Sequence, residues 1–521
     1  MKNKKLLIIL DLMSALMLIF SFPNFIEKGV KYHTFLLGWI AMAPIFIVFI
    51  KAKNKKEIFW YGYLAAGIFY LGSLYWLCFV KVMGIFAYIS WLMLSLFMAL
   101  YIVLSLIFAR LLKEILEIEY LFSVPLLYTV LDFFRERVFT GFPLLSLAQS
   151  QQGFAYVLQV LKFTGMHGLN FLMASFGLII SFIITGTKTN LKKTENIMWA
   201  VITLGLLALL YASNMPDRKN YEQVRVSLLQ ADTDQNVAWD KNYKAKTMEI
   251  YQDLTQKALK DKPRVFIWSE TAYPGALNME PEAGKVISGW SKGLNAYNIV
   301  GSDMVVTSSG GYKYYNSAFL VSPKGSIIGD YSKYHLVPLG EYIPLADVFT
   351  FVQKVVRRYG YESFTKGSKI SPLALDGKYF GVLICYDSLF PEISRDFVRK
   401  GAEFLVHLSY ETWYGNTPAS AQIFTDTALR AVENDVYIAR CVESGISGIV
   451  NNKGQITLAT KLFERTAASG DIYIKREKLN SLYTMLGDWF IYLLIILLVA
   501  VIIIRLAVKK TAPTAYEPAR Q

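Results

Sequence analysis

Polar residues follow three apolar, β-rich runs of the chain and could form one catalytic site. Glu270 follows the run RVFIW, Cys385 follows FGVLI, and Tyr410 and Glu411 follow EFLVHLS. Ligands gather at the carboxyl ends of strands in α/β sheets, so we expect these side chains to share one edge of a sheet. A cysteine in such a place becomes a good nucleophile when a base takes its proton or a nearby charge lowers its pKa.

Glu270 and Lys333 are the candidate partners of a Cys385 nucleophile. Glu270 could take the proton, because a buried setting would raise its pKa and suit it for proton transfer. Lys333 could favour the thiolate and stabilise a tetrahedral oxyanion. Taken singly, each residue also has an ordinary structural interpretation, as a buried thiol, a capping carboxylate or a solvated lysine. His335 and His407 lie in no recognisable cysteine-protease motif, so we do not expect a histidine base.

Residues 220–485 must position this site. Short runs rich in Val, Ile, Phe and Leu alternate there with stretches of helical spacing, such as SAQIFTDTALRAVENDV. This alternation is typical of an α/β domain. A segment of about 260 residues is long enough for one substantial core.

Long apolar runs lie on both sides of this segment. They occupy residues 5–22, 33–50, 57–80, 84–109, 118–134, 168–186, 196–213 and 488–508. Each is near the ~20 residues that a helix needs to cross a bilayer. The run with Pro125 and Asp132 is the weakest, and a kinked or re-entrant segment is its alternative. We expect the first run to be an uncleaved span, because no small-residue cleavage site follows it.

Basic residues orient these runs. Lysines and arginines concentrate at the N-terminus and in 51–57, 110–114, 187–193 and 505–510. With about eight spans, all of these segments fall on one side, which is the cytoplasmic side by the positive-inside rule. The predicted organisation is a membrane domain of about seven helices, an extracytoplasmic catalytic domain, a C-terminal span and a cytoplasmic tail. Their residues are 1–215, 220–485, 488–508 and 509–521.

The composition fits a membrane protein with a sizeable soluble part. Of 521 residues, 54% are hydrophobic and 18% are charged, with a net charge of +14. No basic helix or nucleic-acid motif accompanies that charge, so we ascribe it to the flanks of the spans and expect no nucleic-acid partner. Cys78, Cys385 and Cys441 make no disulfide framework and have no zinc-ligand spacing. We therefore predict no metal and no cofactor.

Three segments resemble the site motifs of the nitrilase superfamily. They are WSETAYP (268–274), YSKYHLVPLGEYIP (331–344) and GVLICYDSLFPE (381–392). The form of the lysine motif, together with the spans, resembles one branch, the apolipoprotein N-acyltransferase family. Further stretches that resemble this family are FTGFPLLSLAQSQ (139–151), QADTDQNVAWD (230–240) and SYETWYG (409–415). The resemblance covers nearly the whole chain and implies an α-β-β-α sandwich for the catalytic domain.

The resemblance also implies roles for individual residues. Glu270 would be the general base, Cys385 the nucleophile and Lys333 the oxyanion-stabilising group, with Glu341 holding or assisting the site. The further supporting and substrate-binding residues would be Tyr386, Asp387, Trp239, Tyr410, Glu411 and Trp413.

The implied reaction is a two-step acyl transfer between lipid-anchored substrates. Cys385 would take an acyl chain from a phospholipid as a thioester and pass it to the α-amine of a diacylglyceryl-cysteine in an apolipoprotein. The implied setting is the bacterial cytoplasmic (inner) membrane, with the catalytic domain on the periplasmic side and membrane lipid around the spans. We expect a monomer.

Some positions depart from the family pattern. Asp387 stands where Glu is common, Tyr410-Glu411 replaces Asn-Asp, and 440–445 reads RCVESG in place of R-x-T-N-x-G. These changes leave the triad intact, but they bear on the choice of acyl donor and acceptor.

Two alternatives share parts of this pattern. A membrane-tethered amidase that hydrolyses a small amide would use the same triad, but the spans and the apolar loop 345–360 favour a lipid substrate. A non-catalytic scaffold or transporter would use charges inside spans. Only Asp11 and Asp132 fall clearly within the predicted runs, which is little support for a transport path.

Overall fold

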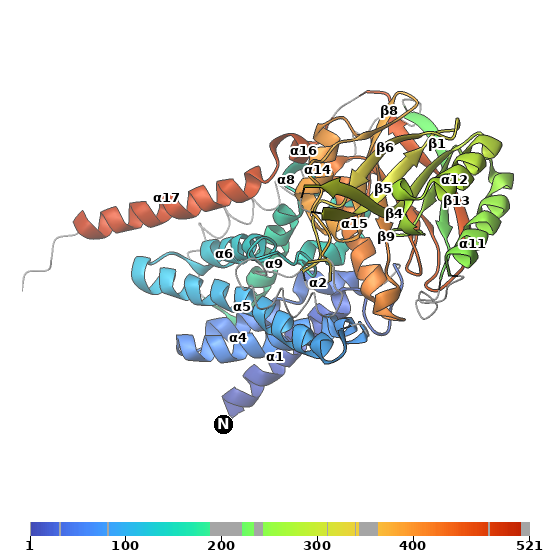
Figure 1. Cartoon of the computed structure of the whole chain (residues 1–521). Helices are drawn as coiled ribbons and strands as arrows, with labels where there is room; N and C mark the ends of the chain where they lie inside the picture. The colour runs from blue at the N-terminus through green and yellow to red at the C-terminus, as the bar shows by residue number, and fades with distance from the viewer. Residues whose placement is uncertain are drawn as a thin grey trace, which may run out of the picture.

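The computed structural model describes most of the chain as a set of long helices joined to an α/β sandwich (Figure 1). The described residues are 2–30, 33–80, 83–187, 221–233, 243–309, 311–338, 340–342, 363–477 and 480–511. The predicted span 196–213, Trp239, the loop 345–360 and residues 512–521 of the predicted tail lie outside the described residues.

Four helical segments of the described chain are long and apolar enough to cross a membrane. They are Thr34–Lys51, Ile85–Leu116 (α5), Met166–Thr185 (α9) and Trp489–Lys510, which lies within α17 (Trp489–Thr511). The first consists of η1 (Thr34–Leu36), α2 (Leu37–Ile40) and α3 (Ala43–Lys51). Four predicted spans therefore correspond to helical segments of spanning length.

Three further helices coincide with predicted spans but are shorter or more charged. They are α1 (Lys2–Ser21), α4 (Lys55–Ser73) and α6 (Tyr120–Arg135). Helix α6 has 16 residues and continues through Pro125. Asp132 of α6 is buried and pairs with Arg135 at 2.8 Å, so its charge is balanced within the protein. The total of about eight spans stays a prediction.

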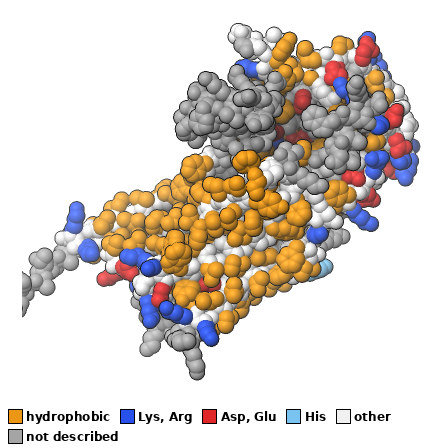
Figure 2. Space-filling model, turned by 60° about the horizontal axis from the view of Figure 1, so that its bottom comes forward, with side chains coloured by type: hydrophobic (Ala, Val, Ile, Leu, Met, Phe, Trp, Pro, Cys, Tyr) orange, Lys and Arg blue, Asp and Glu red, His pale blue; other side chains and the backbone are white. Residues whose placement is uncertain are grey.

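Apolar side chains cover the flank of the helical part (Figure 2). On α5, Ile85 and Met93 are 67% and 66% exposed, and Ile503 of α17 is 60% exposed. Lysines and arginines gather at the helix ends that lie away from the sandwich. Exposed apolar surface of this extent marks an interaction site, and an apolar band bounded by charged ends suits a bilayer.

The sandwich contains two sheets. The first has the order β13-β1-β2-β4-β5-β6, with β3 beside β4, and the second has the order β12-β11-β10-β9-β8-β7. The strands of the first sheet are β1 (Tyr221–Gln230), β2 (Val265–Trp268), β3 (Tyr273–Ala276), β4 (Tyr297–Ser308), β5 (Gly311–Val321), β6 (Ile327–Ser332) and β13 (Thr466–Lys475). Those of the second are β7 (Leu373–Leu375), β8 (Lys378–Ile384), β9 (Phe404–Ser409), β10 (Tyr437–Val442), β11 (Gly448–Val450) and β12 (Ile456–Ala459).

The sheets pack face to face, and helices cover their outer faces. Strand β1 contacts β10, and β5 contacts β8. The outer helices are α11 (Tyr243–Ala258) and α12 (Pro281–Leu294) on the first sheet, and α14 (Pro391–Arg399) and α15 (Ala419–Asn434) on the second. The predicted α-β-β-α sandwich is confirmed.

Parallel strands at the centre of each sheet bring the polar strand ends together. Strands β1, β2 and β4 run parallel in the first sheet, and β8, β9 and β10 do so in the second. The apolar runs are buried on both faces, as parallel strands require. Glu270 follows β2, Cys385 follows β8 and Tyr410 follows β9, so all three lie at carboxyl ends of parallel strands.

Helix α15 joins the catalytic domain to the helical part. All of its residues are buried. Gln149 of η4 (Leu147–Gln151) donates a hydrogen bond to Asp426 at 2.7 Å, and the Trp76 indole donates to Gln422 at 2.9 Å. The stretch 139–151, which the sequence singled out, therefore reaches the catalytic domain.

Candidate active site

Cys385 occupies a strained turn at the end of β8. It begins the short 3₁₀ helix η9 (Cys385–Leu389) and has a φ of 48°, in the left-handed region. Side chains with a Cβ rarely adopt this conformation, which costs about 1–3 kcal/mol and persists only where the surroundings enforce it. Cys385 is a free thiol that keeps partial solvent access although protein atoms surround it on most sides. At this position the charges of Glu270 and Lys333 act on the thiol.

Lys333 and two glutamates form a buried ion cluster. The Lys333 ammonium lies 2.8 Å from Glu341 Oε1 and 3.6 Å from Glu270 Oε1. Its side chain is 1% exposed. Burial alone would lower the pKa of Lys333, but the charges of Cys385, Glu341 and Glu270 raise it well above its usual value. Lys333 therefore stays a cation in the site.

Asn316 joins the two glutamates. Its Nδ2 donates hydrogen bonds to Glu270 Oε1 at 2.6 Å and to Glu341 Oε1 at 3.1 Å. Burial raises the pKa of Glu270, while Lys333 and, to a smaller extent, Asn316 oppose that rise. Asn316 was not predicted, because an asparagine within a strand gives no signal in the sequence without the neighbouring chain.

Burial dominates the protonation of the nucleophile. It raises the pKa of the Cys385 thiol far above its usual value, Glu270 adds to the rise, and Lys333 opposes it. Lys333 thus favours the thiolate as expected, but its effect is smaller than that of burial. A thiol of this kind is protonated at neutral pH and requires a base to react.

Asp387 ties the cysteine turn to the lysine loop. Its carboxylate accepts hydrogen bonds from the backbone N–H of His335 at 2.7 Å and from the Tyr331 hydroxyl at 2.8 Å. The backbone N–H of Ile384, next to the nucleophile, donates to it at 3.3 Å. Burial raises the pKa of Asp387 to about 6. One buried carboxylate thus fixes the spacing between Lys333 and Cys385.

The predicted substrate-binding residues differ in their settings. Glu411 is buried and forms an ion pair with Arg440, so its carboxylate is engaged within the protein. Tyr410 and Trp413 contact each other with ring centroids 5.7 Å apart, and Trp413 is 37% exposed. Trp239 lies outside the described residues. Of the described members of this set, Trp413 is the one that presents a large apolar surface to the outside.

Two active-site neighbours bond to the helical part. The Tyr386 hydroxyl donates to the Gly141 carbonyl at 2.8 Å. The His335 ring nitrogen Nε2 lies 3.1 Å from the Thr140 carbonyl, and the ring stacks on Phe390. The turn that carries Cys385 and the loop that carries Lys333 are therefore both attached to residues 140–141.

His407 lies directly behind the nucleophile. Its Nε2 is 3.2 Å from the Cys385 carbonyl oxygen, which also accepts a hydrogen bond from Ser388 at 3.0 Å. From the sequence, His407 was weighed only as a base. Its contact with the backbone of Cys385 depends on the register of β8 and β9, in which Leu383 pairs with His407.

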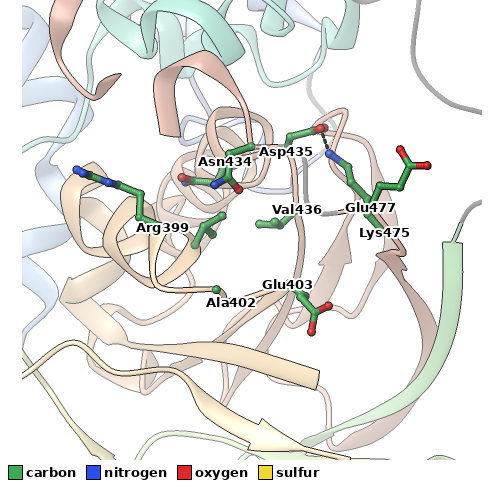
Figure 3. A pocket seen from close by; sticks show the side chains of 11 residues that line it. Arg399, Ala402, Glu403, Asn434, Asp435, Val436, Lys475 and Glu477 are labelled. Atoms are coloured by element: carbon green, nitrogen blue, oxygen red, sulfur yellow. Dashed lines mark hydrogen bonds and ion pairs between the residues drawn. The ribbon is translucent and has the colours of Figure 1, made fainter. Parts of the chain in front are cut away.

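A pocket of about 180 Å³ lies elsewhere, between the ends of α14, α15 and β13 (Figure 3). An ion pair between Lys475 and Asp435 lies on its wall, and Asp435 also pairs with Lys162 at 2.5 Å. None of its lining residues belongs to the predicted site. Because the Asp435 carboxylate is already engaged, we assign this pocket no role in the reaction.

Two family models match the chain, one in each of its two parts. The carbon-nitrogen hydrolase family matches residues 225–477, and the apolipoprotein N-acyltransferase N-terminal domain matches residues 14–179. A crystal structure of a carbon-nitrogen hydrolase from Helicobacter pylori G27 covers 49% of this chain and 90% of its own, with 18% identity and a TM-score of 0.38.

Relatives align over both parts of the chain. The apolipoprotein N-acyltransferase of Chlorobaculum tepidum is 24% identical over 490 residues, which is 89% of this chain and 90% of that protein. The apolipoprotein N-acyltransferase of Geobacter metallireducens is 32% identical over 493 residues, which is 92% of each. The chain therefore belongs to the apolipoprotein N-acyltransferase family.

Proposed function

We propose that this acyltransferase moves an acyl chain from a phospholipid to the N-terminal α-amine of a diacylglyceryl-cysteine in a lipoprotein, through a thioester on Cys385. The observation that carries the proposal is the partly exposed Cys385 thiol, on which the charges of the Lys333–Glu270–Glu341 cluster act. A general base and a fixed cation at a strand-end thiol are the parts that nucleophilic acyl transfer requires.

In the first step Cys385 becomes acylated. Glu270 takes the thiol proton, and the sulfur attacks the ester carbonyl of the phospholipid. The Lys333 ammonium stabilises the oxyanion that forms, and Glu341 holds that ammonium in place. When the intermediate collapses, Glu270 returns the proton to the departing alkoxide, and a lysophospholipid leaves.

In the second step the thioester gives up its acyl group. The neutral α-amine attacks the carbonyl carbon, Glu270 takes one amine proton, and the Cys385 thiolate leaves and is reprotonated. The products are an amide and the free thiol, so the enzyme returns to its starting state. Exclusion of water from the buried cluster protects the thioester from hydrolysis between the two steps.

The membrane setting supports lipid-anchored substrates. Four helical segments of spanning length lie beside the catalytic domain, and basic residues gather at their far ends. We propose the cytoplasmic (inner) membrane of a bacterium as the site of action. We further propose that the chain has about eight spans, with domain boundaries near residues 215, 220, 485 and 508. The catalytic domain would then lie on the periplasmic side. We also propose that the enzyme acts as a monomer.

The exposed aromatic surface near the site suits the lipid substrates. Trp413, with Tyr410 against it, offers apolar area at the strand ends, and we propose that these residues contact substrate together with Trp239. Glu411 and Asp387 act differently, because both are buried and bonded within the protein. We propose that they hold the site in shape.

Labelled phospholipid tests this function directly. The purified full-length enzyme in detergent should acquire label that hydroxylamine removes, and Cys385→Ala should acquire none. A diacylated lipopeptide with a free N-terminus should then receive the label. Label on Cys385→Ala would overturn the nucleophile assignment. Release of free fatty acid without acylated peptide would show a hydrolase instead of an acyltransferase.

A further inference from the structure

Three buried side chains form a chain of hydrogen bonds that ends on the peptide group after Cys385. Glu411 pairs with Arg440, Arg440 contacts His407, and His407 contacts the Cys385 carbonyl. Arg440 and His407 are fully buried, and Glu411 is 3% exposed. Groups buried to this degree are costly unless they are paired, so this arrangement is a fixed part of the structure.

Arg440 fixes which nitrogen of His407 carries the proton. A guanidinium can only donate hydrogen bonds, and its Nη1 lies 3.1 Å from His407 Nδ1. The Nδ1 atom is therefore an acceptor, and the ring proton sits on Nε2. Burial and the charge of Arg440 lower the pKa of His407 well below its usual value, so the ring is neutral. The Nε2–H donates to the Cys385 carbonyl oxygen at 3.2 Å.

The same geometry excludes His407 as a proton acceptor in the reaction. Its Nδ1 faces Arg440 and the Thr427 hydroxyl, which is 3.2 Å away. Its Nε2 carries the proton and is directed at a carbonyl oxygen. No lone pair of the ring is left for the thiol of Cys385.

The accepting carbonyl belongs to the residue whose backbone is strained. The φ of 48° at Cys385 needs outside support, and the His407 and Ser388 side chains supply two donors to its carbonyl. This carbonyl shares one peptide group with the N–H of Tyr386. A hydrogen bond to the oxygen of a peptide group strengthens the N–H of that same group as a donor. The contact from His407 therefore also acts on the N–H of Tyr386.

We propose that His407 is a positioning residue for Cys385: through its Nε2–H it holds the strained peptide group that follows the nucleophile, and the Glu411–Arg440 pair fixes its tautomer. This inference rests on the proposed function, because it takes Cys385 to be the nucleophile. It assigns to Glu411 a place behind the reacting atoms instead of against the substrate.

A matched pair of amides separates this role from simple core packing. In His407→Gln the amide nitrogen can take the place of Nε2 and still donate to Cys385. In His407→Asn the shorter side chain places its amide near the position of Nδ1, where it can meet Arg440 but cannot reach the Cys385 carbonyl. Thr425→Val is the control, because the Thr425 hydroxyl is buried in α15 and donates only to Gln422 of its own helix.

The measurement is the single-turnover rate of Cys385 acylation by labelled phospholipid, for the full-length enzyme in detergent. We expect His407→Asn to lower this rate about tenfold, the effect of one lost buried hydrogen bond, with a phospholipid KM within about twofold of wild type. His407→Gln should remain within about threefold of wild type, and Thr425→Val should match it. The midpoint of the acid limb of the pH–rate profile should stay in place in all variants.

Several results would overturn the inference. Equal losses in His407→Asn and His407→Gln would show that only packing matters, and a wild-type rate in His407→Asn would show that the hydrogen bond is idle. A shift of the acid midpoint by about one unit would make His407 a proton-transfer group. A wild-type enzyme that takes no label on Cys385 would overturn the proposed function itself, which distinguishes that failure from these.

Discussion

Cys385 and Cys441 lie two strands apart in the same sheet, one just past the end of β8 and the other within β10. Burial raises the pKa of both thiols far above the usual value. A carboxylate and a cation also act on each thiol. They are Glu270 and Lys333 for Cys385, and Glu443 and Arg440 for Cys441. Neither the direction of the pKa shift nor the type of charged neighbour separates the two thiols.

The carboxylates beside the two thiols differ in how many donors they meet. Glu443 accepts hydrogen bonds from the Tyr251 hydroxyl at 2.8 Å, from the backbone N–H of Thr233 at 3.0 Å, and from Ser269. Glu270 meets fewer donors: it accepts from the Asn316 amide at 2.6 Å and from the backbone N–H of Tyr410. A carboxylate saturated by donors is a poor base, whereas one with fewer donors can take a proton more readily.

The backbones differ as well. Cys441 lies in a regular strand, and its thiol donates to the Ile267 and Leu229 carbonyls at 3.1 and 3.4 Å. Cys385 lies in the left-handed region. The nucleophile of this protein is thus marked by a base with few donors, a fixed cation and a strained turn, and not by a raised thiol pKa as such.

Replacing the two thiols in turn should give the largest contrast. Cys385→Ala removes the proposed nucleophile and should lower acyl transfer by about 10⁴-fold or more. Cys441→Ala should retain activity within a few-fold, because among the described residues the hydrogen bonds of its thiol go to backbone carbonyls. Transfer of labelled acyl chains to a diacylated lipopeptide measures both, and comparable losses in the two variants would remove the distinction.

Lys333→Met tests the role of the cation that acts on Cys385. The change keeps the length of the side chain and removes the charge that opposes the raised pKa of both Cys385 and Glu270. We expect a loss of about 10²–10³-fold in kcat, typical of removing an oxyanion-stabilising group. Arg440 is not suited to the matching test, because it supports His407 as well as Cys441.

Asp387→Asn tests how far the turn at Cys385 depends on the hydrogen bonds that the Asp387 carboxylate accepts. Loss of the charge weakens the hydrogen bonds from His335 and Tyr331 and should slow acylation about tenfold. The pKa of Asp387 is raised from 3.8 to about 6 in the folded protein, so the fold binds this proton more tightly than the unfolded chain does. The associated stability is present below 3.8 and is lost as the pH rises through about 6.

Thermal unfolding in detergent at several pH values measures the pH-dependent stability that Asp387 contributes. Asp387→Asn should flatten the pH dependence of the unfolding temperature between pH 4 and pH 6, and Asp387→Glu should preserve it. An unchanged pH dependence in the Asn variant would mean that another group accounts for it.

Asn316→Leu tests the protonation of the base. Burial raises the pKa of Glu270 above its usual 4.5, so activity should fall as the pH drops through that raised value and the carboxylate becomes protonated. Asn316 opposes the rise, and its loss should move the acid limb of kcat/KM to higher pH, with about a threefold loss of rate at pH 7. Asn298→Leu, at another buried strand asparagine, is the matched control and should leave the limb in place.

The smallest expected effect is the change in stability on replacing Cys441. Cys441→Ala leaves a small cavity between the sheets and removes two weak S–H contacts, so we expect about 1–2 kcal/mol of destabilisation without a change in the pH profile. Denaturant unfolding in detergent measures this loss. A large change in acylation rate would place Cys441 in the reaction and erase the contrast with Cys385.

Part of this picture could be predicted from the sequence. The apolar runs before Glu270 and Cys385 predict buried strands, and the polar residues after them predict a shared edge, because these signals are local. Lys333 was a candidate from its charge, and the resemblance to known motifs added Glu341. The sandwich followed from the same motifs.

Other features depend on contacts between distant parts of the chain. Asn316 meets Glu270 because β4 and β5 pair in one particular register, and His407 lies behind Cys385 because β8 and β9 do. Two residues with no motif of their own thus enter the site through strand pairing. The positive φ of Cys385 likewise results from surrounding contacts and leaves no local pattern.

The attachment of the active site to Thr140 and Gly141 limits how this protein can be divided or recombined. Tyr386, next to the nucleophile, bonds to the Gly141 carbonyl, and His335, near Lys333, bonds to the adjacent Thr140 carbonyl. A catalytic domain grafted onto foreign helices would keep its interior but would lose the adjacent acceptors that align its two reactive loops. The lipid-facing and catalytic portions are therefore not interchangeable modules, and successful chimaeras must inherit residues 140–141 together with the loops that rest on them.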